Sequence, residues 1–211
     1  MVNGHAPSSR DRLLAAAARE FAARGYDGTS VDRIAHVARL NKAMIYYHFK
    51  SKAGLYRTLV RGVFEAVLAA AVEVADADAP PPEKLRRFVQ SVAEVASRQP
   101  HFPSLWIREF SGGATHIDID TLRVAGRVVV TLGRILDEGR ERGFFKPASP
   151  LLVHIGVIAP ILLVLDSAAA RDRLGRADAP GARELTLERM IHHVTESTLG
   201  SLCIHAEDIH A

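Results

Sequence analysis

The sequence predicts an all-α protein of about nine helices, in which an N-terminal three-helix head precedes a larger helical domain. Apolar residues recur three and four positions apart along almost the whole chain, and no stretch shows the strict alternation of a half-buried strand. Alanine, the strongest helix former, is abundant. Glycine and proline gather between the periodic segments, where they end helices.

The first predicted helix covers residues 9–24, after an irregular start in residues 1–8. One face carries its apolar residues, which are Leu13, Leu14, Ala17, Ala18 and Phe21. Gly25 follows as a residue that ends helices. Arg10 and Arg12 lie near the start of the helix, which disfavours cations unless an anion lies close by.

Two short helices joined by a tight corner come next, within residues 29–49. Thr29 or Ser30 is suited to cap the first of them, because a hydroxyl oxygen can accept from the free N–H groups of the opening turn. Arg39 and Leu40 form the corner, and Asn41 is a good cap for the second helix. The core predicted for the head consists of Leu14, Phe21, Val31, Ile34, Leu40, Ile45 and Phe49.

The outward face of the second short helix combines a cation, an amide, two phenols and an imidazole with a small residue. This mixture suits the major groove of DNA, where Lys42 can donate to guanine and small Ala43 lets the backbone approach. Ser51 can cap the following helix, so Lys52 lies in its first turn, where a phosphate would be a suitable partner. The candidate DNA-binding residues are Arg10, Thr29, Ser30, Asn41, Lys42, Ala43, Tyr46, Tyr47, His48 and Lys52.

The rest of the chain predicts six further helices and a boundary between two domains, residues 1–50 and 51–211. A long helix over residues 51–75 connects the domains and ends at the proline-rich stretch 76–82. The later helices are predicted at residues 83–99, 105–110, 120–142, 151–174 and from 186 to about 205. Residues 151–165 are apolar nearly all round, which predicts burial on more than one side.

Charge is divided unevenly between the two parts. Residues 1–62 hold 11 Lys and Arg against 4 Asp and Glu, a formal charge of +7, whereas the remainder holds 16 against 20, a charge of −4. A basic N-terminal part joined to an acidic partner domain is typical of nucleic-acid-binding proteins. Charge alone does not separate nucleic-acid binding from the alternative, a basic surface that only faces solvent.

The stretch that carries these features resembles the DNA-binding domain of TetR-family (tetracycline-repressor-like) transcriptional regulators. The matching residues are Gly25-Tyr26, Thr29-Ser30-Val31, Ile34-Ala35, Lys42 through Tyr46, His48-Phe49 and Ser51-Lys52. The resemblance covers roughly residues 10–60 in sequence and the whole chain in length and helical layout. One departure is Arg39, at a corner where the family usually has glycine.

The resemblance implies a ligand-responsive repressor that binds inverted half-sites in duplex DNA as a homodimer. It implies a dimer interface built from two helices of each chain, here Leu165, Leu187, Ile191, Val194, Thr198 and Leu202. It also implies a pocket for a small, mostly apolar or aromatic effector, with the candidates Phe64, Leu68, Phe88, Phe102, Trp106, Phe110, His154, Ile158 and Leu162. Ordinary core packing remains the alternative for each of these residues.

Other classes of function find little support in the sequence. It contains no HExxH motif, no phosphate-binding glycine loop, no nucleophile elbow and no CxxC, so neither catalysis, a cofactor nor a metal site is expected. Glu207 and His210 have a spacing used in di-iron bundles, but they lack the matching set from other helices. A helical adaptor that binds an acidic partner through the basic head stays open as an alternative.

The predicted compartment is the cytoplasm. A single cysteine, Cys203, excludes an internal disulfide and fits a reducing environment. The first ten residues contain no apolar stretch of the kind that a secretory signal requires. The longest apolar run, residues 156–165, is shorter than the ~20 residues needed to cross a bilayer, so no membrane partner is expected.

Overall fold

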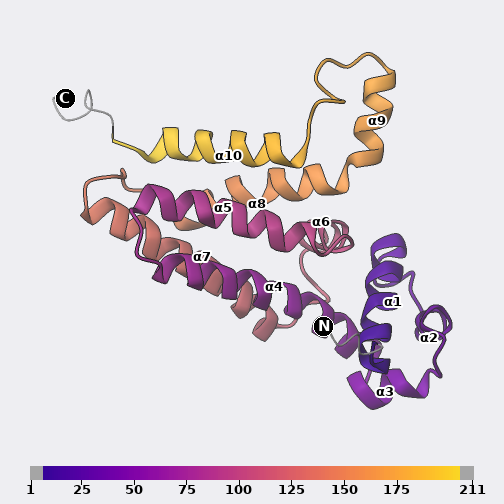
Figure 1. Cartoon of the computed structure of the whole chain (residues 1–211). Helices are drawn as coiled ribbons and strands as arrows, with labels where there is room; N and C mark the ends of the chain where they lie inside the picture. Colours follow the sequence, from indigo (N-terminus) through magenta and orange to yellow (C-terminus); the bar gives the residue numbers. More distant parts are fainter. Residues whose placement is uncertain (1–6, 205–211) are drawn as a thin grey trace, which may run out of the picture.

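The structure, a computed structural model, describes residues 7–204 of the 211-residue chain, and it is all-helical as predicted. The described part contains ten helices (Figure 1): α1 (Ser9–Arg24), α2 (Val31–Ala38), α3 (Ala43–Phe49), α4 (Lys52–Asp76), α5 (Pro81–Ser97), α6 (Phe102–Ser111), α7 (Ile119–Glu141), α8 (Pro150–Asp166), α9 (Ala168–Arg176) and α10 (Leu187–Leu202). Most of the start predicted to be irregular, and the Glu207–His210 pair, lie outside the described residues.

Helices α1, α2 and α3 form a separate head at one end of the molecule (Figure 1). Ser8 and Asp11 begin α1 with a reciprocal capping box, in which each side chain bonds to the other's backbone N–H. The head core contains Leu13, Phe21, Ile34, Ile45 and Phe49, all buried. Three residues that the sequence placed in this core, Leu14, Val31 and Leu40, are only partly buried against it.

Helix α4 connects the head to the larger body. The Ser51 hydroxyl oxygen caps it by accepting from the Gly54 N–H at 3.0 Å. The helix packs against α1 and α3 near its start and against α5 and α7 over the rest of its length. Helix α4 therefore forms a continuous connection between the body and the head.

Helices α8 and α10 pack against each other on one side of the body, where α10 also covers α5 (Figure 1). Helix α9 projects away from this pair, together with the loop that leads to α10 (Figure 1). The body core lies between α4, α5, α7 and α8, and includes Phe88, Leu132, Ile135, Ile161 and Leu162.

The number of helices differs from the prediction because the segment at residues 151–174 breaks into α8 and α9. The two helices meet at Ser167 with a bend of 68°. Arg171 holds the corner by donating to the Val164 carbonyl oxygen and to the Ser167 hydroxyl. The break lets the chain leave the apolar body, since the residues between Ser167 and α10 are mostly exposed.

Two smaller features complete the fold. Helix α5 begins at Pro81, inside the stretch at which the previous helix was predicted to end. Proline is tolerated in the first turn because the N–H that it lacks would have no partner within the helix there. No single helix in residues 7–204 is long and apolar enough to cross a bilayer; α8 and α9 reach that length and composition only as a bent pair.

Candidate nucleic-acid interface and internal cavity

The corner between α2 and α3 sets the position of α3 in the head. Arg39 takes a left-handed conformation with φ 53° and ψ 46°. The Leu40 N–H donates to the Ala35 carbonyl and the Arg39 N–H to that of His36, the pattern that usually ends a helix at glycine. Arg12 on α1 then clamps the corner by donating through Nη2 to the carbonyl oxygens of Ala38 at 2.6 Å and Arg39 at 3.2 Å. Arg12, a cation near the start of α1, therefore has partners within the head.

Helix α3 presents an exposed polar face. Tyr46 and Tyr47 are 49% and 71% exposed. Lys42, not the predicted Asn41, occupies the N-cap position of α3, and Lys42 and Ala43 are both exposed there. The Asn41 side chain accepts from the Ala43 N–H at 2.8 Å. A solvated face of this composition, on a short helix after a tight turn, can enter a major groove.

Lys42 is also linked to α2. Its ammonium lies 2.9 Å from Asp32 Oδ1, and this hydrogen bond with a neighbouring carboxylate holds the pKa of Lys42 above its usual value. Both side chains are more than half exposed, so the pair contributes little to stability. Asp32 was not among the predicted residues, and the spacing of ten residues gives no helical signal that could identify the pair.

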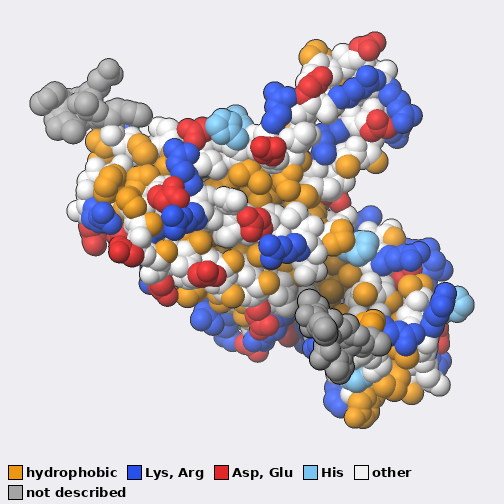
Figure 2. All heavy atoms as spheres, viewed as in Figure 1, with side chains coloured by type: hydrophobic (Ala, Val, Ile, Leu, Met, Phe, Trp, Pro, Cys, Tyr) orange, Lys and Arg blue, Asp and Glu red, His pale blue; other side chains and the backbone are white. Residues whose placement is uncertain are grey.

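Two further predicted residues bind within the head while remaining at its surface. His48 is partly buried, and its Nε2 lies 2.9 Å from the Ser9 hydroxyl of α1. Arg10 is exposed, and its guanidinium lies over the Phe49 ring, 5.6 Å from the centroid. Both contacts join α1 to α3. Figure 2 shows Lys and Arg side chains spread over the head, next to a hydrophobic patch at its free end.

The structure corrects the interpretation of Thr29 and Lys52 as residues that face DNA. Thr29 is 1% exposed, and its hydroxyl donates to the carbonyl oxygens of Glu20 and Gly25. Ser30, not Thr29, caps α2 by accepting from the Arg33 N–H. The Lys52 ammonium donates to the carbonyl oxygens of Tyr26 at 2.9 Å and Thr29 at 3.0 Å. These backbone carbonyl groups, rather than a phosphate, are therefore the partners of Lys52.

A cavity of about 380 Å³ opens among α4, α6, α7 and α8. Six of the nine predicted pocket residues line it: Phe64, Phe102, Trp106, Phe110, His154 and Ile158. The other three, Leu68, Phe88 and Leu162, are buried in the core outside it. Helix α7 supplies a wall that the sequence did not identify, with Leu122, Ala125, Gly126, Val128 and Val129. The small side chains of that wall were a possible signal, since they leave space beside large ones.

His154 is the polar residue in this apolar lining. Its Nδ1 is enclosed, and the imidazole has no hydrogen-bond partner among the residues that the structure describes. Burial lowers the pKa of His154, which favours the neutral imidazole. The rings of Trp106 and Phe110, also in the lining, stack with their centroids 4.6 Å apart. The cavity thus combines flat aromatic surfaces with an imidazole that has no hydrogen-bond partner.

A buried polar cluster joins the body to the head beside this cavity. Glu109 on α6 is 5% exposed, and it accepts from the Tyr56 hydroxyl at 2.8 Å and from the His116 N–H at 2.7 Å. Burial and the Glu109 carboxylate raise the pKa of Tyr56. The His116 ring lies against Tyr26 of the head, with centroids 4.3 Å apart, and 3.8 Å from the Asp27 carboxylate. The role of His116 was not predicted from the sequence.

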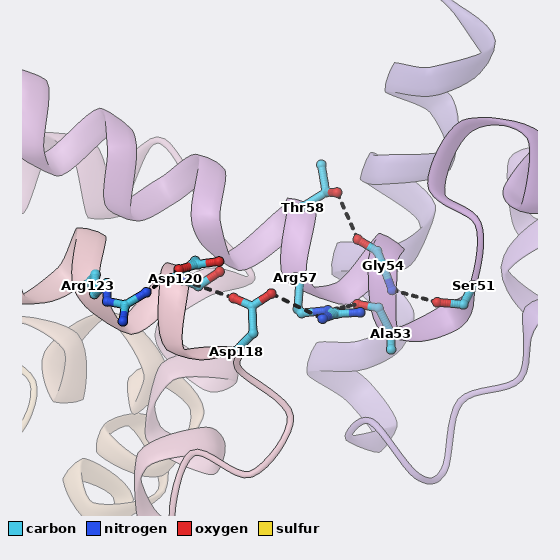
Figure 3. A network of polar contacts seen from close by, with 9 residues as sticks. Ser51, Ala53, Gly54, Arg57, Thr58, Asp118, Asp120 and Arg123 are labelled. Atoms are coloured by element: carbon cyan, nitrogen blue, oxygen red, sulfur yellow. Dashed lines mark hydrogen bonds and ion pairs between the residues drawn. The ribbon is translucent and has the colours of Figure 1, made fainter.

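A second polar connection binds the start of α4 to α7 (Figure 3). Arg57 donates to Asp118 at 3.1 Å and to the Ala53 carbonyl oxygen at 3.2 Å. Asp118 in turn caps α7 by accepting from the Thr121 N–H at 2.9 Å. The first turns of α4, which contact the head, are thereby held to the helix that forms one wall of the cavity.

The predicted dimer-interface residues lie on the α8–α10 side of the body but differ in exposure. Val194 and Leu202 are each 4% exposed within one chain, so they close the core of the single chain. Leu165, Leu187, Ile191 and Thr198 are partly buried. Apolar residues with greater exposure lie on α8, where Leu152 and Leu163 are 71% and 59% exposed. A groove of about 630 Å³ runs between α8 and α10.

Comparison with known proteins matches both parts of the chain. Residues 13–59 match the family described as bacterial regulatory proteins, tetR family, and residues 81–177 match the tetracyclin repressor-like C-terminal domain. The chain is 28% identical over 143 residues to the HTH-type transcriptional repressor NicS of Pseudomonas putida, covering 67% of this chain and 68% of NicS.

Two further similarities concern the head and the fold. Over 56 residues, 26% of this chain and 30% of the relative, the chain is 39% identical to IcaR, the HTH-type negative transcriptional regulator of the biofilm operon icaADBC in Staphylococcus aureus. The structure is similar to the ketosteroid transcriptional regulator KstR2 of Mycobacterium tuberculosis, with a TM-score of 0.71 and 24% identity over 97% of this chain and all of that one.

Proposed function

The chain belongs to the TetR family of bacterial transcriptional regulators, and from this premise we propose that it is a homodimeric repressor that a small ligand releases from its operator. Two copies of α3 would enter successive major grooves, which requires an operator with inverted half-sites. The ligand would occupy the cavity among α4, α6, α7 and α8. Such a regulator acts in the cytoplasm, where it meets the chromosome.

The exposed face of α3 is the observation that carries this proposal. Tyr46, Tyr47 and Lys42 are available on a helix that follows a clamped corner, and the surrounding part of the chain carries a formal charge of +7. Lys42 would donate to a base edge after leaving Asp32, while the tyrosine hydroxyls would bind phosphate oxygens. Repression is the direction supported by the similarity to the repressor NicS and the negative regulator IcaR.

Helix α6 supports a mechanism for release by ligand. It carries Trp106 and Phe110 into the cavity and Glu109 into the polar cluster that touches the head. A ligand that displaces the aromatic pair would move Glu109, and with it the contacts of Tyr56 and His116. Release requires that the ligand bind the DNA-incompetent arrangement more tightly, because equal affinity for both states shifts no population.

The test of this proposal measures DNA binding by the full chain. Operator duplexes would be selected from a random pool, and a two-fold symmetric consensus is expected. Affinity should fall by about 10³-fold or more between low and moderate salt, as for proteins that neutralise several phosphates. Absent or salt-insensitive binding would contradict the proposal.

The Lys42→Ala variant then tests the role of α3. We expect it to relax base preference at one position of each half-site by about 1–3 kcal/mol. Lys50→Ala is the matched control, because Lys50 is exposed just beyond α3, with its ammonium directed at the Tyr47 carbonyl. The control should keep the base preference, and a uniform loss of affinity over all sequences in Lys42→Ala would contradict base recognition by Lys42.

A further inference from the structure

We propose that the cavity takes an uncharged, mainly apolar ligand of about two rings that carries a single hydrogen-bonding group, such as a phenol, alcohol, ketone or amide, for His154. This inference rests on the proposed function, because it names the chemical class of the ligand that would act at the same cavity. It goes further by excluding carboxylates and ammonium compounds and by assigning the polar contact to one side chain.

The exclusion of charged ligands follows from the lining. None of the fourteen residues that line the cavity is Lys, Arg, Asp or Glu. A buried carboxylate or ammonium group would therefore lose its hydration without gaining a partner of opposite charge. His154 offers no positive charge either, since the desolvation that lowers its pKa favours the neutral ring.

The position of His154 determines where the hydrogen-bonding group of the ligand must lie. The imidazole has no hydrogen-bond partner in residues 7–204, and because its Nδ1 is enclosed by protein, Nε2 is the ring nitrogen left for a ligand in the cavity. A neutral imidazole both donates and accepts, so a hydroxyl, a carbonyl or an amide on the ligand can pair with it. Apart from the Trp106 indole N–H, which can only donate, the remaining lining side chains are hydrocarbon, so a second donor group on the ligand would be buried without a partner.

The shape of the lining favours flat or ring-shaped ligands. Trp106 and Phe110 form one stacked aromatic surface, and Phe64 and Phe102 meet edge to face with centroids 5.8 Å apart. Gly126 on the α7 wall leaves its neighbourhood open, since a Cβ built there meets nothing within 4 Å. A volume of about 380 Å³ lies within the range of small-molecule sites and accommodates a two-ring compound.

The experiment compares three probes of one shape: p-phenylphenol, biphenyl and p-phenylbenzoate. Trp106 is the single tryptophan of the chain and lines the cavity, so its fluorescence reports binding directly, without DNA. We expect p-phenylphenol to bind about tenfold more tightly than biphenyl, the contribution of one hydrogen bond. The anionic p-phenylbenzoate should bind at least about a hundredfold more weakly than p-phenylphenol because its carboxylate is buried unpaired.

Variants of His154 assign the preference to this side chain. His154→Leu should bind p-phenylphenol and biphenyl equally, whereas His154→Gln, which keeps a hydrogen-bonding group, should retain part of the preference. His192→Leu is the matched control, because His192 is exposed on α10 outside the cavity, and it should behave as the wild type.

Three results would overturn the proposal: no response to any probe, p-phenylbenzoate binding as tightly as p-phenylphenol, or an unchanged preference in both His154 variants. Failure of the proposed function looks different. In that case p-phenylphenol binds with the expected preference, but the protein binds no operator, or the operator affinity does not change when the probe is bound.

Discussion

Arg39 is the residue at which this chain departs most clearly from the usual helix-turn-helix corner. The structure keeps the left-handed backbone that glycine adopts freely, with φ 53°, and adds the Arg12 clamp on the Ala38 and Arg39 carbonyl oxygens. A non-glycine residue in this conformation costs about 1–2 kcal/mol. The clamp and the two closing hydrogen bonds hold the corner in spite of that cost.

We therefore expect Arg39→Gly to stabilise the protein by about 0.5–1 kcal/mol, the released strain less the greater chain entropy of glycine. Urea unfolding of both proteins measures the difference. Arg19→Gly is the control with the opposite expected sign, because Arg19 is exposed inside α1, where glycine costs about 1 kcal/mol. A destabilised Arg39→Gly would mean that the Arg39 side chain contributes more than its backbone strain costs.

At the scale of elements, α6 lies between the cavity and the head. Its residue Glu109 is a buried carboxylate whose partners come from α4 and from the loop before α7. Because α4 and that loop both contact the head, the cluster relates the position of α6 to that of α1 and its following turn. Helix α4 is additionally fastened to α7 through Arg57 and Asp118 (Figure 3).

Tyr56→Phe tests this connection by removing the hydroxyl that donates to Glu109. We expect the variant to bind p-phenylphenol as tightly as the wild type, as measured by Trp106 fluorescence. Saturating p-phenylphenol should, however, reduce the operator affinity of the variant by a smaller factor than it reduces that of the wild type. A loss of about 1–3 kcal/mol of stability should accompany the change, because the carboxylate stays buried with one partner fewer. Tyr26→Phe is the matched control, since the Tyr26 ring contacts remain. An unchanged affinity ratio in Tyr56→Phe would show that the cluster does not transmit the ligand signal.

The contact between α5 and α7 gives the fold a dependence on pH. Lys84 is buried and donates to Glu138 at 2.8 Å and to the Ala75 carbonyl at 3.0 Å. The hydrogen bond from Lys84, with another from Arg142, holds the pKa of Glu138 below its usual value. A carboxyl group whose pKa is lowered by folding stabilises the protein above its unfolded pKa, and this stabilisation is lost as the pH falls through the folded pKa.

Accordingly, Glu138→Gln should lower the free energy of unfolding near neutral pH by about 2–3 kcal/mol, less than a fully buried pair because Glu138 is one-third exposed. The difference from the wild type should stay constant above about pH 5 and shrink below it, as Glu138 of the wild type becomes protonated. Urea unfolding from acid to neutral pH measures this. Glu94→Gln, which disrupts an exposed pair with Arg98, should change stability by less than about 0.5 kcal/mol.

For the molecule as a whole, the α8–α10 side is the surface best suited to pairing. Leu152 lines the groove, Leu163 is exposed further along α8, and hydrophobic side chains form a band below α10 in Figure 2. The head lies at one end of the molecule, on the first turns of α4, so pairing through α8 and α10 leaves both heads free. The two recognition helices are then related by the same two-fold axis as the half-sites of an operator.

Leu163→Glu should convert the dimer to a monomer, because a charge would be buried in a self-complementary contact, and operator affinity should fall more than about tenfold. Sedimentation velocity and DNA binding measure the two effects. Leu174→Glu replaces an equally exposed leucine on α9 and should leave both unchanged. A Leu163→Glu protein that stays dimeric would place the interface elsewhere.

The sequence by itself determined the helices, the head and the character of its exposed helix, because these depend on local signals. The spacing of Ile34, Ile45 and Phe49, the Ser30 cap of α2 and the glycine and proline breaks all act over a few residues. Six cavity residues were also predicted, since large aromatic residues in a helical domain are natural candidates for a pocket.

Only the tertiary structure decided which polar groups meet across the fold. The partners of Lys52 are carbonyl groups 23 and 26 residues earlier, and those of Glu109 lie on α4 and in a following loop. No local spacing encodes such contacts, because they depend on how helices pack after they have formed. For the same reason the α7 wall, the enclosed imidazole of His154 and the burial of Thr29 and Val194 follow from packing alone.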